Sequence, residues 1–289
     1  MKNILITGCS SGFGHLAAKQ LAGKGHNVYA TMRNVAGKNS KAATELKAYA
    51  SDNNVKLQVI ELDVTSDDSV NAAIKEVSNV DVLINNAGLG YGGPVEAFSS
   101  EQVLEQLDLN IVGTLRVAKA VLPRMREQKS GLIIQLSSIA GRAAFPGFGV
   151  YNASKWGLEG VSEALRYELS PLGIDVVIVE PGPFATDFFG NVIQAEDEQV
   201  ASAYGHINEF MQGFGQTVES LYKDENAPTD PMIVVDIFDR LIEMPNGSRP
   251  LRTIAGLDFG LQVLNDAVEP IRKASLDGFD ISSWDGPTA

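Results

Sequence analysis

A tyrosine and a lysine stand four positions apart in a segment whose apolar residues repeat at helical spacing. Tyr151 opens this segment and Lys155 follows, while Leu158 and Leu165 continue its apolar stripe. Residues four apart on a helix share a face, so the ammonium lies near the phenol. A neighbouring ammonium favours the phenolate, and we expect the pKa of Tyr151 to fall below its ordinary value of about 10. Such a phenol is a general acid or base near neutral pH, although Tyr-Lys pairs also occur by chance on exposed helix faces.

An apolar run precedes this helix and ends in a serine. Residues 131–136 read GLIIQL, which is typical of a buried strand, and Ser137 and Ser138 follow. Glycines and a proline at positions 141–149 then break the chain before Tyr151. The strand end can therefore place the Ser138 hydroxyl beside the phenol, where it would hold a substrate oxygen.

A glycine-rich turn follows the first apolar run of the chain. Residues 2–7 predict a short buried strand, residues 8–14 read GCSSGFG, and a helical stripe and a second strand at 27–32 come next. Strand, glycine turn, helix and strand form the βαβ unit that holds a dinucleotide, because the free amides at the helix N-terminus bind a pyrophosphate. The glycine spacing is looser than the general fingerprint, and a purely structural turn is the alternative.

Strands and helices alternate over most of the chain. Strands are also expected at 55–62, 80–84, 131–138, 174–179 and 250–254, and helices at 41–51, 101–128, 149–170, 230–245 and 257–271. We expect Pro123 to end or kink one helix and Pro270 to break another. The alternation predicts an α/β fold with a parallel sheet, helices on both faces, and a ligand site beyond the carboxyl ends of the strands.

Composition excludes several classes of protein. The 289 residues are 44% hydrophobic and 20% charged, as in a globular chain with a large core, and the net charge of −13 argues against nucleic acid or an anionic membrane as a partner. One cysteine excludes internal disulfides. The absence of a signal-peptide core or a long apolar span predicts a cytoplasmic protein. His15, His26 and His206 lie apart from other ligand types, so we predict no metal.

The pattern becomes irregular after Pro183. Aromatic residues are scattered among acids and glycines, and we expect residues 190–228 to form a helical substrate lid, with a plain surface excursion as the alternative. Residues 229–289 are expected to add C-terminal helices and the last strand. Without a linker or repeat, residues 1–289 are expected to form one domain whose cofactor-binding and catalytic core is 1–190.

Six features in order resemble the short-chain dehydrogenase/reductase family over about residues 1–190. They are TGCSSGFG (7–14), NNAG (85–88), Asn110, Ser138, YNASK (151–155) and PGPFAT (181–186). The resemblance implies a single-domain Rossmann fold, a doubly wound parallel sheet of about seven strands with a C-terminal substrate lid. The segment VYATMRN and the C-terminal portion resemble the hydroxysteroid and retinol dehydrogenase branch, which takes lipophilic alcohols and ketones.

The same resemblance implies the cofactor contacts. Those expected at the pyrophosphate are Gly8, Ser10, Ser11, Gly12, Phe13 and Gly14. Those expected at the adenosine are Asp63 and Val64 for the adenine and Asn86, Ala87 and Gly88 for the ribose. Those expected at the nicotinamide carboxamide are Pro181, Gly182, Phe184 and Thr186. Phe184 stands where an aliphatic residue is usual, a change that a backbone contact tolerates.

The catalytic roles follow from the resemblance as well. Tyr151 would exchange a proton with the substrate oxygen while a hydride passes between nicotinamide and carbon. Lys155 would lower the pKa of Tyr151 and bind the nicotinamide ribose, and Ser138 would polarise the carbonyl. Asn110 would hold a water that connects Lys155 to solvent, with a helix-kinking polar residue as the alternative.

The second strand ends in Met32-Arg33 without the acid that an NAD site usually places there. Arg33 suits a 2′-phosphate and favours NADP(H) over NAD(H), although a solvated loop arginine is the alternative. We therefore predict an NADP(H)-dependent oxidoreductase that interconverts a lipophilic carbonyl compound and an alcohol. A non-catalytic NADP(H)-binding sensor is the second hypothesis.

The expected partners are a small-molecule substrate and further copies of the chain, in a homodimer or homotetramer formed through helices 101–128 and 149–170.

Overall fold

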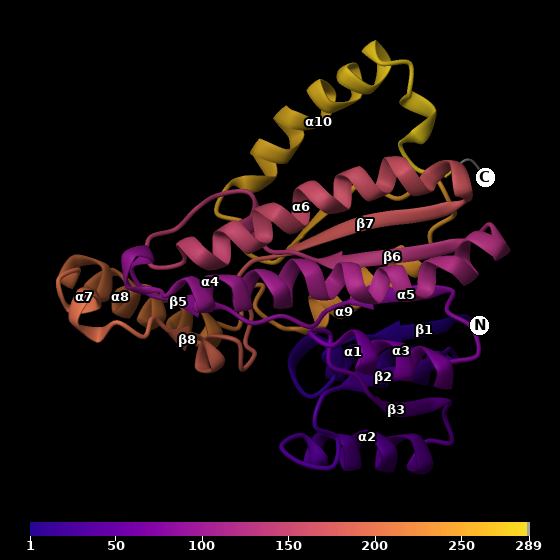
Figure 1. Ribbon diagram of the computed structural model, residues 1–289, viewed down its shortest axis with the longest axis horizontal. Coiled ribbons are helices and arrows are strands. Elements are labelled where there is room, and N and C mark those ends of the chain that lie inside the picture. The colour runs from indigo at the N-terminus through magenta and orange to yellow at the C-terminus, as the bar shows by residue number, and fades with distance from the viewer. Residues whose placement is uncertain (288–289) are drawn as a thin grey trace.

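A seven-stranded parallel sheet forms the centre of the protein in the computed structural model, which describes residues 1–287 (Figure 1). The strands are β1 (Asn3–Ile6), β2 (Asn27–Met32), β3 (Leu57–Glu61), β4 (Val82–Asn85), β6 (Gly131–Leu136), β7 (Ile174–Pro181) and β9 (Arg252–Ala255). Their order across the sheet is β3-β2-β1-β4-β6-β7-β9. The chain therefore changes direction across the sheet between β3 and β4, and the crevice at such a switch point is where ligands bind. The predicted Rossmann fold is confirmed.

Both faces of the sheet are buried, which explains the nearly continuous apolar runs. Successive side chains of a strand point to opposite faces, so Ile4 and Ile6 enter one core cluster while Leu5 enters the other. The helices of the first face are α1 (Gly12–Gly23), α2 (Ser40–Asp52) and α9 (Met232–Glu243). Those of the second are α3 (Asp67–Glu76), α5 (Gly113–Gln128) and α6 (Gly149–Leu169). Ser66 caps α3, as its hydroxyl accepts a hydrogen bond from the Ser69 amide at 3.2 Å.

The helix predicted over residues 101–128 is in fact three segments. They are α4 (Ser100–Leu107), a π-helical turn (Asp108–Val112) and α5. Pro123 lies inside α5 and does not end it, so only the expected kink there stays a prediction. Pro270 likewise lies inside α10 (Leu261–Gly278), and the expected break of that helix is wrong. Each proline is exposed, and water can bond the carbonyl that loses its amide partner.

A helical extension lies beyond the carboxyl ends of the strands. It contains β8 (Ile193–Gln194), α7 (Glu198–Ser202) and α8 (Gly205–Lys223), at the far left of Figure 1. β8 pairs in parallel with β5 (Tyr91–Gly92), which ties this extension to the core. Short 3-10 helices complete the chain at Val95–Ala97, Ile139–Gly141, Ser170–Leu172, Phe189–Asn191 and Ser282–Trp284. Over residues 1–287, no helix combines the length and apolar character needed to cross a bilayer.

Candidate active site

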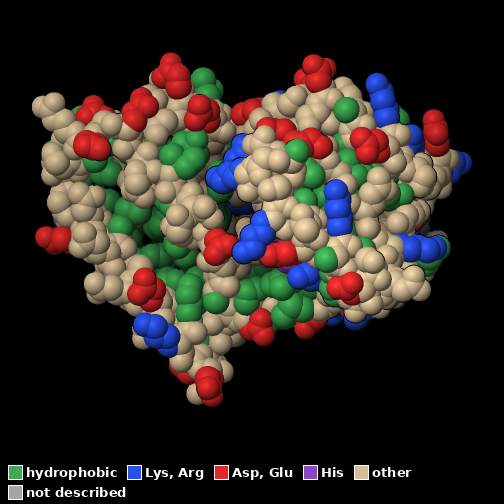
Figure 2. Space-filling view, turned by 90° about the horizontal axis from the view of Figure 1, so that it is seen from below, with side chains coloured by type: hydrophobic (Ala, Val, Ile, Leu, Met, Phe, Trp, Pro, Cys, Tyr) green, Lys and Arg blue, Asp and Glu red, His purple; other side chains and the backbone are tan. Residues whose placement is uncertain are grey.

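A cleft of about 560 Å³ opens at the carboxyl ends of the strands. Figure 2 shows a hollow with hydrophobic walls and basic side chains at its edge. The cleft brings together most of the predicted site residues: Gly8, Ser10, Ser11, Gly12, Phe13, Arg33, Asp63, Val64, Asn86, Ala87, Gly88, Ser138, Tyr151, Lys155, Pro181, Gly182, Phe184 and Thr186. Gly14 and Asn110 lie behind its wall rather than on its surface.

The glycine turn is braced from the neighbouring strand end. Asn86 donates from its side chain to the carbonyl of Thr7 at 2.8 Å and to that of Gly8 at 3.1 Å. Gly8 has φ +73°, and a Cβ on Gly14 would lie 2.6 Å from the Gly8 carbonyl oxygen, so both positions require glycine. Thr7, which was not among the predicted contacts, accepts the Asn86 and Ala87 amides with its hydroxyl at 3.0 Å. These contacts fix the turn at the start of α1, where the free amides of a helix N-terminus can bind an anion.

The loop after β2 carries two cations toward the cleft. Arg33 and Lys38 both line it, and both are exposed. Glu61, at the end of β3, accepts the amides of Asn34 at 2.6 Å and Val35 at 2.7 Å, so this carboxylate is occupied in holding the loop. Lys38 could not be assigned from the sequence, because only the folded loop brings it beside Arg33.

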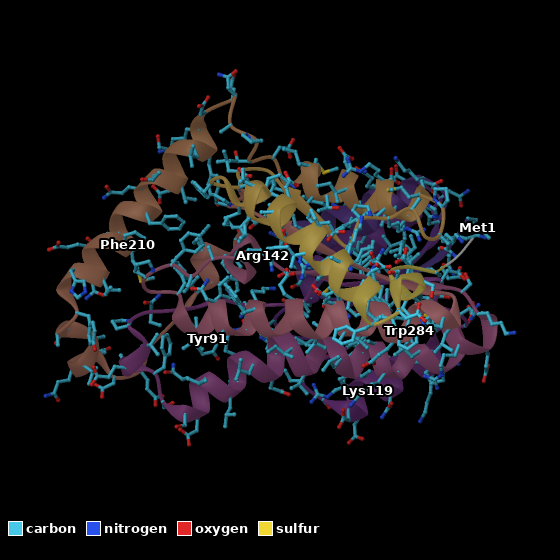
Figure 3. The ribbon with its side chains drawn as sticks, turned by 90° about the horizontal axis from the view of Figure 1, so that it is seen from above. Met1, Tyr91, Lys119, Arg142, Phe210 and Trp284 are labelled. Atoms are coloured by element: carbon cyan, nitrogen blue, oxygen red, sulfur yellow. The ribbon has the colours of Figure 1, made fainter. Side chains whose placement is uncertain are left out.

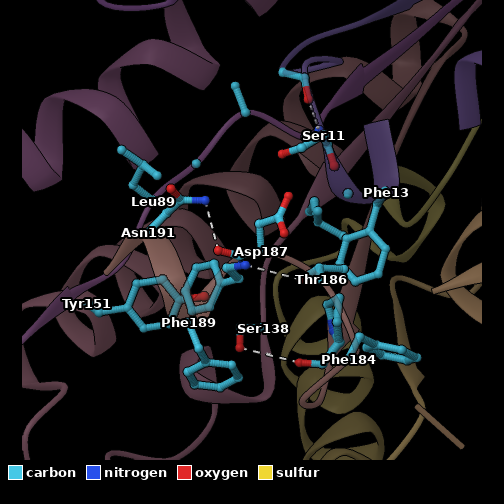
Figure 4. A pocket seen from close by; sticks show the side chains of 18 of the residues that line it. Ser11, Phe13, Leu89, Ser138, Tyr151, Phe184, Thr186, Asp187, Phe189 and Asn191 are labelled. Atoms are coloured by element: carbon cyan, nitrogen blue, oxygen red, sulfur yellow. Dashed lines mark hydrogen bonds between the residues drawn. The ribbon is translucent and has the colours of Figure 1, made fainter. Parts of the chain in front are cut away.

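Ser138, Tyr151 and Lys155 meet on the floor of the cleft. Ser138 caps the 3-10 helix after β6, accepting the Ala140 amide at 3.1 Å, and its hydroxyl donates to the Pro181 carbonyl at 3.4 Å (Figure 4). Lys155 donates to the Leu136 carbonyl at 2.9 Å, and its Nζ lies 5.8 Å from the centre of the Tyr151 ring. Two separate elements, the loop after β6 and helix α6, thus bring a hydroxyl, a phenol and an amine to one place.

The expected lowering of the Tyr151 pKa is wrong for this cleft. Tyr151 is only 8% exposed, and burial raises its pKa to about 12, an effect that the nearby Ser138 hydroxyl partly offsets. Burial also lowers the pKa of Lys155 to about 8. The phenol is consequently neutral at neutral pH, and its proton is available for transfer.

Asn110 lies at the centre of the π-helical turn, which confirms that the helix is irregular at this residue. Its side chain donates to Ser154 Oγ at 2.9 Å and to the Leu89 carbonyl at 3.1 Å, and it accepts the Leu89 amide at 3.3 Å. A Cβ on Gly88 would lie 3.1 Å from Asn110 Oδ1 and 3.8 Å from Lys155 Nζ. Asn110 therefore fixes the wall beside Lys155, and its role in holding a water stays a prediction.

Aromatic side chains line the other half of the cleft. They are Phe145, Phe148, Phe188, Phe189, Phe210 and Phe214. The last four belong to the segment around the predicted lid, whereas Phe145 and Phe148 precede Tyr151 and were not predicted. Phe148 and Phe214 meet edge to face with centroids 6.0 Å apart, so α8 packs on the loop before α6. This half of the cleft suits an apolar ligand.

The family model of short chain dehydrogenases matches residues 2–197. The chain is 35% identical to 3-ketodihydrosphingosine reductase of Bacteroides thetaiotaomicron, over 88% of this chain and 87% of that protein. It is also 35% identical to human 17-beta-hydroxysteroid dehydrogenase type 1, over 84% of this chain and 74% of that protein. A short-chain dehydrogenase from Streptomyces avermitilis has a similar structure, with TM-score 0.76, 31% identity and 96% of each chain covered.

The chain belongs to the short-chain dehydrogenase family. It is an oxidoreductase that acts on alcohol or carbonyl groups with a nicotinamide cofactor. The expected branch is confirmed too, since hydroxysteroid and retinol dehydrogenases are among its relatives.

Proposed function

We propose that this protein is an NADP(H)-dependent oxidoreductase that interconverts a lipophilic ketone or aldehyde and its alcohol. The observation that carries the proposal is the position of Tyr151, Ser138 and Lys155. These side chains lie between the glycine turn at one end of the cleft and the aromatic cluster at the other. A nicotinamide and an apolar carbonyl compound can therefore meet at the phenol.

The residues of this chain would handle the proton and the orientation of the substrate. Bound NADPH supplies the hydride. Ser138 would hold the carbonyl oxygen, and Tyr151, neutral because burial raises its pKa, would donate its proton to that oxygen as negative charge develops there. In the reverse direction the phenolate would take the alcohol proton. Lys155 would stabilise the phenolate and bind the nicotinamide ribose.

The preference for NADP(H) rests on the loop after β2. Two cations line the cleft there, and a guanidinium binds a phosphate in a bidentate, charge-assisted way. Glu61, the acid at the end of β3, already accepts two backbone amides of this loop, so we do not expect it to bind the ribose in place of the arginine. These contacts support a 2′-phosphate.

A panel of ketones and aldehydes tests the proposal through the oxidation of NADPH. We expect apolar ketones to react faster than small polar ones, and Tyr151→Phe to bind NADPH normally while turnover falls about 1,000-fold or more. Equal rates for wild type and variant would remove Tyr151 from the chemistry. Binding of NADPH without turnover on any carbonyl compound would support the alternative, a cofactor-binding sensor.

A further inference from the structure

Three glutamates and two arginines lie together behind the floor of the cleft. Glu159 and Glu163 come from α6, Glu180 from the end of β7, Arg142 from the loop after Ser138 and Arg252 from β9. Figure 3 places Arg142 beside α10, which adds the uncharged side chain of Asn265 to this group. The cluster therefore joins the strand end that precedes Pro181, the helix of Tyr151 and the loop of Ser138.

The guanidinium of Arg252 forms ion pairs with all three glutamates. Arg252 Nε lies 2.8 Å from Glu159 Oε2 and 3.5 Å from Glu180 Oε1, and its Nη2 lies 2.6 Å from Glu163 Oε2. Arg142 approaches Glu180 Oε1 only to 3.9 Å, because its Nε donates to Asn265 Oδ1 at 2.8 Å. Asn265 in turn donates to Glu180 Oε2 at 2.5 Å.

The cluster carries more acids than cations, and two of the acids are shut off from water. Glu180 is 0% exposed and Glu159 is 3% exposed. Oε1 of Glu159 and Oε1 of Glu180 are both buried without a hydrogen-bond partner. A buried carboxylate oxygen without a donor is costly, and one proton bound between two such groups removes a charge and supplies a donor.

The electrostatics of the site agree with this geometry. Burial and the charge of Glu159 raise the pKa of Glu180 to about 8, and burial raises the pKa of Glu159 as well. Arg252, Arg142 and the Ser137 hydroxyl oppose the effect on Glu159 without cancelling it. Glu163 is more exposed and accepts a hydrogen bond from Tyr167 at 2.9 Å, and Arg272 contacts that phenol in turn.

We propose that Glu159 and Glu180 form a buried acid pair that holds one proton at neutral pH and thereby sets the charge that Lys155 experiences. Glu159 follows Lys155 by one helical turn, and its charge favours the ammonium form of that lysine. A Cβ on Gly141 would lie 2.9 Å from Glu159 Cγ and 2.8 Å from Ser137 Oγ, so Glu159 also packs against the loop that carries Ser138. Glu159 and Glu180 are thus positioning residues for the tyrosine and lysine.

The shared proton does not depend on the proposed function, and it is tested first. In the full-length protein at pH 7, infrared spectroscopy should show the carbonyl band of a protonated carboxylic acid, which disappears above about pH 9 and is absent in Glu180→Gln. Glu163→Gln, which alters the less buried acid on the same arginine, should keep the band. A wild-type spectrum without it overturns the acid pair, whatever the variants do.

The pH dependence of thermal unfolding gives a second test of whether the folded protein binds this proton. The folded protein holds it up to about pH 8 while the unfolded chain releases it near 4.5, so this stabilisation is lost as pH rises through the folded value. We expect the melting temperature of wild type and Glu163→Gln to fall between about pH 6 and pH 9. The fall should be clearly smaller in Glu180→Gln, and an equal fall in all three proteins contradicts the proposal.

The link to Lys155 rests on the proposed function and is tested by the pH dependence of kcat/KM for ketone reduction. Glu159→Gln removes the negative charge, so the alkaline limb should move to lower pH by about one unit. Glu180→Gln removes only the charge that Glu180 gains above about pH 8, so the limb should move in the same direction but less, and Glu163→Gln should leave it unchanged. An unmoved limb in Glu159→Gln, or an equal shift in Glu163→Gln, refutes the coupling. Absence of turnover refutes the proposed function and leaves the infrared result standing.

Discussion

The ring of Phe188 lies against the ring of Tyr151, with centroids 5.4 Å apart and planes tilted by 52°. Phe188 in turn meets Phe189 edge to face at 5.4 Å. A Cβ on Gly90 would lie 2.8 Å from Phe188 Cζ, so the absence of a side chain at Gly90 makes room for this ring. One aromatic residue from the segment before the lid thus covers the phenol that is proposed to carry the reacting proton.

Removing this cover should make Tyr151 more acidic. Burial is the largest cause of its raised pKa, so Phe188→Ala should return the pKa from about 12 toward the ordinary value of 10. The pKa of Tyr151 is measured by following phenolate absorbance against pH in Phe188→Ala. The absorbance of the same variant with Tyr151→Phe is subtracted to remove the other tyrosines. Phe210→Ala, which alters a lid ring stacked on Phe214, is the control and should leave the pKa unchanged. An unchanged value in both would mean that other walls of the cleft bury the phenol.

Reversing the charge of Arg33 should change the cofactor preference. Charge-assisted hydrogen bonds contribute about 1.5–3 kcal/mol, so Arg33→Asp should weaken NADPH binding roughly 10- to 150-fold while NADH binding is kept or improved. Isothermal titration with both cofactors measures the change. Lys41→Asp, on an exposed part of α2 outside the cleft, controls for net charge. Parallel losses for NADPH and NADH would mean that Arg33 does not recognise the 2′-phosphate.

Lys155 should make stability rise with pH in the alkaline range. Its pKa falls from 10.5 to about 8 on folding, so between these values the unfolded chain binds a proton that the folded protein has released. The cost of burying the ammonium disappears in this window, and the stability contributed by this residue increases with pH. Unfolding by urea at about pH 7.5 and pH 9.5 should show wild type gaining relative to Lys155→Met. A constant difference between the two proteins would contradict the lowered pKa.

The outer faces of α4 and α6 should form the contact between copies of the chain. Leu104 on α4 is 65% exposed and Trp156 on α6 is 51% exposed, and Val112 in the π-helical turn after α4 is 44% exposed. Large apolar side chains are thus uncovered where α4 and α6 lie side by side. We expect a homodimer or homotetramer, and Trp156→Glu combined with Leu104→Glu should lower its mass in light scattering. Val263→Glu, at an exposed position on α10, is the control and should leave the mass of the oligomer unchanged. A monomeric wild type would refute this contact.

The sequence predicts the fold well because the relevant signals are local. Apolar runs such as residues 131–136 and 174–179 end in glycine, serine, asparagine or proline, and these ends form the edge of the sheet where the cleft opens. The Tyr151-Lys155 pair is local in the same sense, since helical spacing alone places the two on one face.

The features that were not predicted depend on contacts between distant segments. Tyr151 is buried by segments distant in the sequence, among them the one that carries Phe188, so the expectation based on Lys155 alone gave the wrong direction for its pKa shift. Lys38 reaches the cleft because Glu61 holds its loop. The π-helical turn at Asn110 lies in a segment without glycine or proline, and its bonds to Leu89 and Ser154 favour an irregular turn that local propensity does not indicate.

Residues up to Thr186 carry the glycine turn, the serine and the phenol, whereas much of the aromatic wall comes from the stretch that follows. Evolution can therefore retune what this enzyme accepts by exchanging one contiguous insert, without rebuilding the machinery that moves the hydride and the proton. The same division offers a route for engineering, in which a donor insert has to match the pairing of β8 with β5, the packing of Phe214 on Phe148 and the hydrogen bonds of Gln102 to Gln194 and Glu196.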